Sequence, residues 1–175
     1  MPNSALHFPN PSTLLGSDGW LASNQLPGQA PARALQYPGL MTHAVLTLLG
    51  FEPRIIKQRN ESGDALRRVA FYAGDQLFLL AISQIPVPML LQHPWLRKLG
   101  DTPLGEAIER HAGVQRNDFE ILPVSAGTDL ATNFGSLPTW ARRYHFELPD
   151  GQITVMELFN PELLEQLESL MPATN

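Results

Sequence analysis

Two alternating segments joined by a short turn constrain the fold of this chain more than any other feature of its sequence. Trp140–Leu148 and Gln152–Phe159 each alternate apolar with polar side chains, which is the pattern of a strand with one buried face. Pro149-Asp150-Gly151 lies between them, and a turn of this kind joins neighbouring antiparallel strands. The sequence therefore predicts a β-hairpin and, with it, an antiparallel sheet.

The rest of the chain supplies further strands. Four more segments show a period of two: Pro53–Arg59, Ala65–Tyr72, Leu77–Ile85 and Arg116–Val124. Turn-like stretches at residues 60–64 and 73–76 are short enough to link the first three of these segments as hairpins. We therefore expect these neighbours to run antiparallel as well.

Helical patterns lie between and after the strands. The expected helices are Leu40–Leu49 ending at Gly50, Pro88–Leu99, Pro103–Ala112 with Asp101 or Thr102 as its cap, and a terminal helix beginning at Asn160-Pro161. Hairpin-linked strands with helices gathered between and after them indicate an α+β domain. Its core is a single antiparallel sheet of about six strands, with helices covering one face.

The N-terminal segment differs from the rest of the chain. Up to Leu40 only Asp18 and Arg33 are charged, and six prolines interrupt every apolar cluster. We expect an irregular, proline-rich N-terminal arm over residues 1–38 and one folded domain over residues 39–175.

Composition excludes several classes of function. The net charge is −5 and no basic run is present, so nucleic acid is not an expected partner. The chain has no cysteine, and its five histidines do not pair at metal-ligand spacing, so we expect no metal. No stretch approaches the roughly 18 apolar residues of a membrane span, and no basic segment followed by an apolar one opens the chain. We expect a cytoplasmic protein without membrane contact.

Four ionisable residues lie on strand faces that alternation predicts to be apolar. Glu157 is in phase with the apolar residues of its strand, and Arg142 is in phase with the aromatic residues of the other hairpin strand. Arg67 is in phase with Val69, whereas Arg68 lies on the other face of the same strand, which is also apolar. Burying an unpaired charge is costly, so these positions indicate either a function or a specific partner.

These charges allow two interpretations. Glu157 could lie on a solvent-exposed face near a sheet edge, and each arginine could form a structural ion pair or extend its head group into water. Taken together, they predict a mostly apolar cavity with one carboxylate and one or two guanidinium groups, which suits a small planar organic anion. Because Glu157 would repel the ligand's acid group, we expect it to face the other end of the ligand, as a hydroxyl acceptor or as a base.

Several short motifs occur together in a recognisable order and spacing. They are Leu66-Arg67, Lys98-Leu99-Gly100-Asp101-Thr102-Pro103-Leu104-Gly105, Trp140-Ala141-Arg142-Arg143 and Glu157-Leu158-Phe159, with Met41-Thr42 and Ile85-Pro86-Val87 also fitting. In these motifs the sequence resembles the bacterial chorismate lyases, over about Gly39 to Pro161. The arm before Gly39 and the tail after Pro161 fall outside the resemblance.

This resemblance implies a monomeric domain whose ligand is buried beneath helical flaps, without metal or organic cofactor. The family converts chorismate to 4-hydroxybenzoate and pyruvate, a reaction of ubiquinone biosynthesis: the ring loses the proton of its hydroxyl-bearing carbon as the neighbouring enolpyruvyl group departs. It implies that Arg67 binds the ring carboxylate and that Glu157 is the active-site glutamate. With Arg142 from the alternation, the expected substrate-binding residues are Met41, Arg67, Leu104, Arg142 and Glu157.

One position departs from the family pattern. Ile82 stands where the third strand of chorismate lyases commonly carries an arginine. Chorismate is a dianion, so a missing cation threatens recognition of its enolpyruvyl carboxylate, although Arg142 or Arg68 could substitute. Two functions therefore stay open: a lyase, and a non-catalytic domain of the same fold that binds or senses an aromatic acid. A sensor would need a separate DNA-binding partner, because the sequence shows no helix-turn-helix segment.

Overall fold

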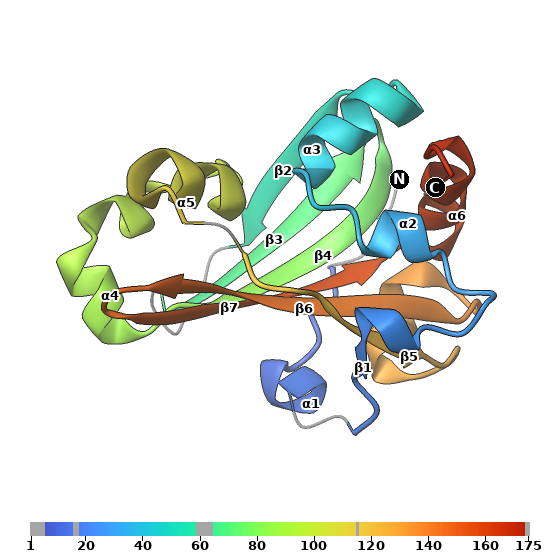
Figure 1. The fold of residues 1–175 in the computed structure, drawn as a ribbon, viewed down its shortest axis with the longest axis horizontal. Coiled ribbons are helices and arrows are strands. Elements are labelled where there is room, and N and C mark those ends of the chain that lie inside the picture. The colour runs from blue at the N-terminus through green and yellow to red at the C-terminus, as the bar shows by residue number, and fades with distance from the viewer. Residues whose placement is uncertain (1–5, 16–17, 59–64, 115, 174–175) are drawn as a thin grey trace.

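The computed structural model describes residues 6–15, 18–58, 65–114 and 116–173. Within these residues, seven strands form one antiparallel sheet in the order β1-β5-β6-β7-β4-β3-β2 (Figure 1). The strands are β1 (Leu21–Ala22), β2 (Pro53–Gln58), β3 (Leu66–Ala73), β4 (Gln76–Gln84), β5 (Glu120–Val124), β6 (Thr139–Leu148) and β7 (Gly151–Phe159). The predicted α+β architecture is confirmed. The additional strand, β1, is two residues long and pairs with β5 at one sheet edge.

Helices are distributed on both sides of the sheet. They are α1 (Pro11–Leu15), α2 (Ala32–Leu35), α3 (Met41–Ala44), α4 (Val87–Gln92), α5 (Leu104–Ala112) and α6 (Pro161–Leu170). Short 3₁₀ helices are η1 (Ser23–Gln25), η3 (Pro94–Lys98) and η4 (Asp129–Phe134), and a π-helical turn, η2 (Val45–Leu49), continues α3. Gly50 ends that turn with a φ of 71°, a left-handed conformation that glycine adopts without strain.

The sheet separates two apolar cores. On one face, strand side chains pack against α2 to α6; α3 lies over β2 and β3, and α5 lies beyond the end of β2 (Figure 1). On the other face, a second cluster lies beneath α1 and η4 and includes Leu14, Leu80 and Leu122. The sequence predicted one covered face, and the structure shows that part of the N-terminal segment covers the other. That segment is not irregular throughout, because it contains α1, α2 and β1.

The predicted hairpins are present where both strands are described. The β3–β4 turn joins Ala73 to Gln76, and the β6–β7 turn joins Leu148 to Gly151. The expected turn at residues 60–64 lies outside the described residues. Asn160 caps α6 as predicted, since its Oδ1 accepts hydrogen bonds from the N–H groups of Glu162 and Leu163.

Two local predictions were wrong. The strand expected over Arg116–Val124 begins only at Glu120, and Arg116 forms an isolated bridge with Phe146. The reason is Asn117, whose side-chain Oδ1 accepts the N–H of His145 at 2.6 Å, so the side chain replaces a ladder carbonyl there. Neither Asp101 nor Thr102 caps α5, because Pro103 holds the cap position.

Candidate functional site

A cavity lies between the helical layer and the centre of the sheet. Its apolar wall includes Met41, Val69, Phe71, Leu79, Leu104 and Val155. Its polar groups are Thr42, Arg67, Ser83, Arg116, Tyr144 and Glu157. An apolar wall with few polar groups is the usual composition of a small-molecule site, and here two arginines and one carboxylate provide the charge.

Arg67 points into this cavity from β3. Its side chain is 4% exposed, whereas Arg68 is half-buried on the opposite sheet face. One guanidinium nitrogen, NH2, donates to the carbonyls of Gly100 and Thr102 at 3.0 and 2.8 Å, which ties the turn before α5 to the sheet. The buried Nε has no hydrogen-bond partner among the described residues. An unpartnered buried donor on a cation is costly, so this atom is available for an anionic acceptor.

Burial also affects the proton affinity of Arg67. Desolvation lowers its pKa well below the ordinary arginine value, to about 10, and the charge of Asp101 partly opposes this fall. The guanidinium therefore remains charged at neutral pH. It presents a positive charge to the cavity with little water to screen it.

Glu157 enters the cavity from β7 and has two protein partners. The Nε of Arg142 donates to its Oε2, and the Tyr144 hydroxyl donates to its Oε1 at 3.1 Å. The carboxylate is 8% exposed. Because each carboxylate oxygen has two lone pairs, both oxygens can still accept a hydrogen bond from a ligand.

Arg142 lies behind Glu157, and it is not among the cavity-lining residues. It is fully buried, its NH1 donates to the carbonyl of Leu35 at 3.1 Å, and its guanidinium lies 4.5 Å from the centre of the Phe119 ring. Of the five site residues expected from sequence, the structure thus brings Met41, Arg67, Leu104 and Glu157 together along one cavity. The fifth residue, Arg142, instead forms a buried ion pair with Glu157, which was the other interpretation of these charges.

Tyr144 and Arg116 also line the cavity, and sequence reasoning did not select them. Tyr144 is two residues after Arg142 on β6, so the period of two was a usable signal for it. Burial raises the pKa of its phenol, the charge of Glu157 adds to this rise, and Arg142 and Arg116 oppose it. Tyr144 therefore stays protonated and acts as a hydrogen-bond donor. No comparable signal marked Arg116, which lies outside the strands.

Ile82 occupies the opposite sheet face. It pairs with Arg68 on β3 and Met156 on β7, is 1% exposed, and belongs to the second core beneath α1 and η4. Its neighbours Ala81 and Ser83 are the β4 residues that face the cavity. The Ile82 side chain therefore does not line the cavity.

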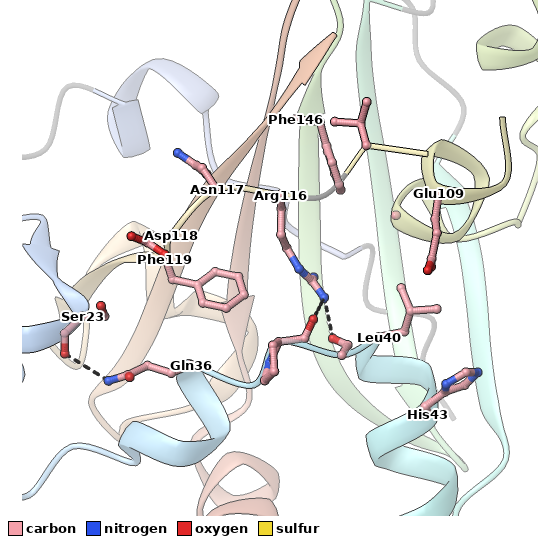
Figure 2. Close-up of a pocket in the computed structure, with 14 residues that line it drawn as sticks. Ser23, Gln36, Leu40, His43, Glu109, Arg116, Asn117, Asp118, Phe119 and Phe146 are labelled. Carbon is pink, nitrogen blue, oxygen red and sulfur yellow. Dashed lines mark hydrogen bonds between the residues drawn. The ribbon is translucent and has the colours of Figure 1, made fainter. Parts of the chain in front are cut away.

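A second, larger pocket, here called the outer pocket, adjoins the cavity. Figure 2 shows its lining, in which the Arg116 side chain reaches the chain segment before α3 and has the Phe119 ring beside it. The pocket and the cavity share three lining residues, Leu40, Gly105 and Arg116. Arg116 thus stands at the boundary between the two spaces.

Within the described residues, no group of three histidine or acidic side chains could hold a metal ion. In the same part of the chain, no helix is long and apolar enough to cross a bilayer.

An apolar cavity beneath helices, with a charged guanidinium and a carboxylate in its wall, has the composition of a small-molecule site. A family model described as chorismate lyase matches residues 17–168. The chain therefore belongs to the chorismate lyase family. The match begins before Gly39 and ends after Pro161, so it includes most of the segment that the sequence resemblance left outside. A search of curated proteins found no match.

Proposed function

We propose that this protein is a cofactor-free lyase that converts chorismate to 4-hydroxybenzoate and pyruvate. Membership of the chorismate lyase family supports this activity at the level of the family. The observation that carries the proposal is the Nε of Arg67, a buried cationic donor with no partner among the described residues. It lies in a cavity whose wall is mostly apolar, as an aromatic or cyclohexadienyl ring requires.

In this proposal Arg67 binds the ring carboxylate. The planar fork of a guanidinium positions a carboxylate through directed hydrogen bonds, and the two carbonyls that hold NH2 fix its orientation. Met41 and Leu104 come from the two helices above the sheet and contact the ring. A substrate held in this way has one orientation in the cavity.

Glu157 then faces the hydroxyl-bearing end of the ring, as a hydrogen-bond acceptor or as the base. In the elimination, the C–H bond at the hydroxyl-bearing carbon breaks, its electrons form the new ring double bond, and the neighbouring C–O bond to the enolpyruvyl group breaks. The enolpyruvate takes up a proton and becomes pyruvate, and the ring becomes aromatic. Tyr144 and Arg142 hold the two oxygens of Glu157 in place while this happens.

The direct test is incubation of the purified protein with chorismate, followed by quantification of both products. Pyruvate is measured with lactate dehydrogenase and NADH, and 4-hydroxybenzoate by chromatography. The proposal requires both products in equal amounts, at a rate above that of chorismate alone. Binding of 4-hydroxybenzoate without release of pyruvate would instead support the second candidate, a domain that only binds an aromatic acid. That candidate rested on Ile82, which is remote from the cavity wall.

The proposal also includes a monomeric state, a cytoplasmic location and a role in ubiquinone biosynthesis, as the family resemblance implies. Analytical ultracentrifugation tests the first of these: a single species of about 19.4 kDa is expected. A dimer at micromolar concentration would contradict it.

A further inference from the structure

We propose that Arg116 binds the second carboxylate of a dianionic substrate, at the boundary between the cavity and the outer pocket. This inference rests on the proposed function and identifies the group that recognises the enolpyruvyl end of the substrate. Among the described arginines, only Arg67 and Arg116 line the cavity. Arg116 is therefore the one that can bind a second acid group apart from the group bound by Arg67.

The other candidate cations are excluded by position or by pairing. Arg68 faces the opposite side of the sheet from the cavity. Arg142 is engaged with Glu157 and with the carbonyl of Leu35, and it does not line the cavity. Arg67 has one unpartnered buried donor, which suits one carboxylate. A dianion bound by Arg67 alone would leave its second negative charge in an apolar space near Glu157, which is electrostatically unfavourable.

Arg116 is held in place by neutral partners. Its NH2 donates to the carbonyl of Gly39 at 2.7 Å and to that of Pro38 (Figure 2), and its guanidinium lies 5.3 Å from the centre of the Tyr144 ring. Among the described residues no carboxylate forms an ion pair with it, although Glu109 and Asp118 line the same outer pocket. Carbonyls and aromatic rings thus hold the guanidinium in place, and no described carboxylate neutralises its positive charge.

Position then assigns the substrate's two acid groups. Arg67 comes from β3, and Arg116 precedes β5 on the far side of Tyr144 and Glu157 in the sheet order. A ring between the two arginines places its own carboxylate at Arg67 and the enolpyruvyl carboxylate at Arg116. The leaving group then points toward the outer pocket, the larger of the two spaces, where enolpyruvate can depart.

The test compares two ligands that differ by one carboxylate. The probes are 4-hydroxybenzoate, a monoanion, and 3-(carboxymethoxy)-4-hydroxybenzoate, a dianion with its second acid at the ring position of the enolpyruvyl group. Affinities are measured by calorimetry for the wild-type protein, Arg116→Gln, Arg116→Lys and Arg68→Gln. Arg68→Gln removes the same charge from the opposite sheet face and serves as the matched control.

We expect Arg116→Gln to weaken binding of the dicarboxylate at least about tenfold and that of the monocarboxylate less than about threefold. Arg116→Lys retains the charge and is expected to fall between wild type and Arg116→Gln, while Arg68→Gln changes neither affinity. Equal weakening of both probes by Arg116→Gln would show that Arg116 only holds the Pro38–Gly39 segment, and it would overturn the inference, as would no change.

Kinetics separate this inference from the proposed function. If the wild-type protein releases pyruvate, Arg116→Gln should raise the KM for chorismate, and an unchanged KM would overturn the role of Arg116 while the lyase activity stands. If the wild-type protein releases no pyruvate but Arg116→Gln still selectively loses the dicarboxylate, the lyase proposal fails and the role of Arg116 stands. A wild-type protein that binds the monocarboxylate more tightly than the dicarboxylate would contradict the inference regardless of turnover.

Discussion

Arg142 and Glu157 lie directly opposite each other on β6 and β7, and the guanidinium of one donates to the carboxylate of the other beneath the cavity floor. Arg142 is fully buried and Glu157 is 8% exposed. The carboxylate that lines the cavity is therefore half of a buried ion pair. Substitutions at these two positions must be judged on stability as well as on activity.

The ion pair predicts strong energetic coupling between its partners. Arg142→Met leaves the Glu157 carboxylate without its counter-charge and should lower the free energy of unfolding by about 3–5 kcal/mol. The double variant Arg142→Met with Glu157→Gln should recover part of this loss, because no uncompensated charge remains. Urea unfolding of the two single variants and the double variant completes the cycle. Additive losses would mean that the two groups contribute independently.

Glu157→Gln separates charge from shape at the site. The amide oxygen can still accept the hydrogen bond from Arg142, and its NH2 group can donate to the Tyr144 hydroxyl oxygen, so affinity for 4-hydroxybenzoate should stay within about tenfold of wild type. Pyruvate release should fall by at least about a hundredfold, because the carboxylate is removed from the reacting end of the ring. Glu120→Gln is the matched control, since Glu120 pairs with Arg143 rather than with a cavity residue. Wild-type turnover in Glu157→Gln would exclude this carboxylate from the mechanism.

Substitutions of Arg67 and Arg68 test which of these two neighbouring arginines on β3 binds the carboxylate of the ligand. Arg67→Lys retains a charge but loses the planar donors, so aryl-acid binding should weaken by roughly 1.5–3 kcal/mol. Arg68→Lys should change this affinity little, because consecutive strand residues point to opposite faces. Calorimetric titration with 4-hydroxybenzoate measures both variants. The reverse result, with binding lost only in Arg68→Lys, would exclude Arg67 as the carboxylate ligand.

Tyr144 should make stability depend on pH in the alkaline range. Burial raises its pKa above the ordinary value of 10.0, so above about pH 10 the unfolded chain loses the phenolic proton while the folded protein keeps it. The contribution of this group to the free energy of unfolding is fully present below pH 10. Above pH 10 it falls by about 1.4 kcal/mol per pH unit. Tyr144→Phe lacks this group, so the stability difference between wild type and variant should shrink between pH 10 and 11. Urea unfolding of both proteins across that range measures this difference. A stability difference that stays constant would show that burial does not raise the pKa of the phenol.

Alternation in the sequence located much of this site because a strand allows only two directions for a side chain. It assigned Arg67 and Glu157 to apolar faces, and both line the cavity. The same hairpin also contained the partner of Glu157, since the short turn at Pro149-Asp150 fixes the register that sets Arg142 opposite it.

Other features depended on tertiary structure. Arg116 lies where the Asn117 side chain interrupts the expected strand, so no periodic pattern reports its direction. The orientation of Arg67 depends on carbonyls of Gly100 and Thr102, more than thirty residues away. Ile82 was interpreted through its family position alone, and the pairing of β4 with β3 and β7 was needed to show which face it occupies.

The second core gives the N-terminal segment a role in solubility. Leu14 of α1 is 1% exposed against the sheet face opposite the cavity, and β1 covers the outer edge of β5. A protein shortened to begin at Gly39 would retain every residue of the cavity wall yet present an open strand edge and a broad apolar surface to water. Such surfaces promote self-association. The residues of α1 and β1 that keep these surfaces covered are therefore separate from those that line the cavity.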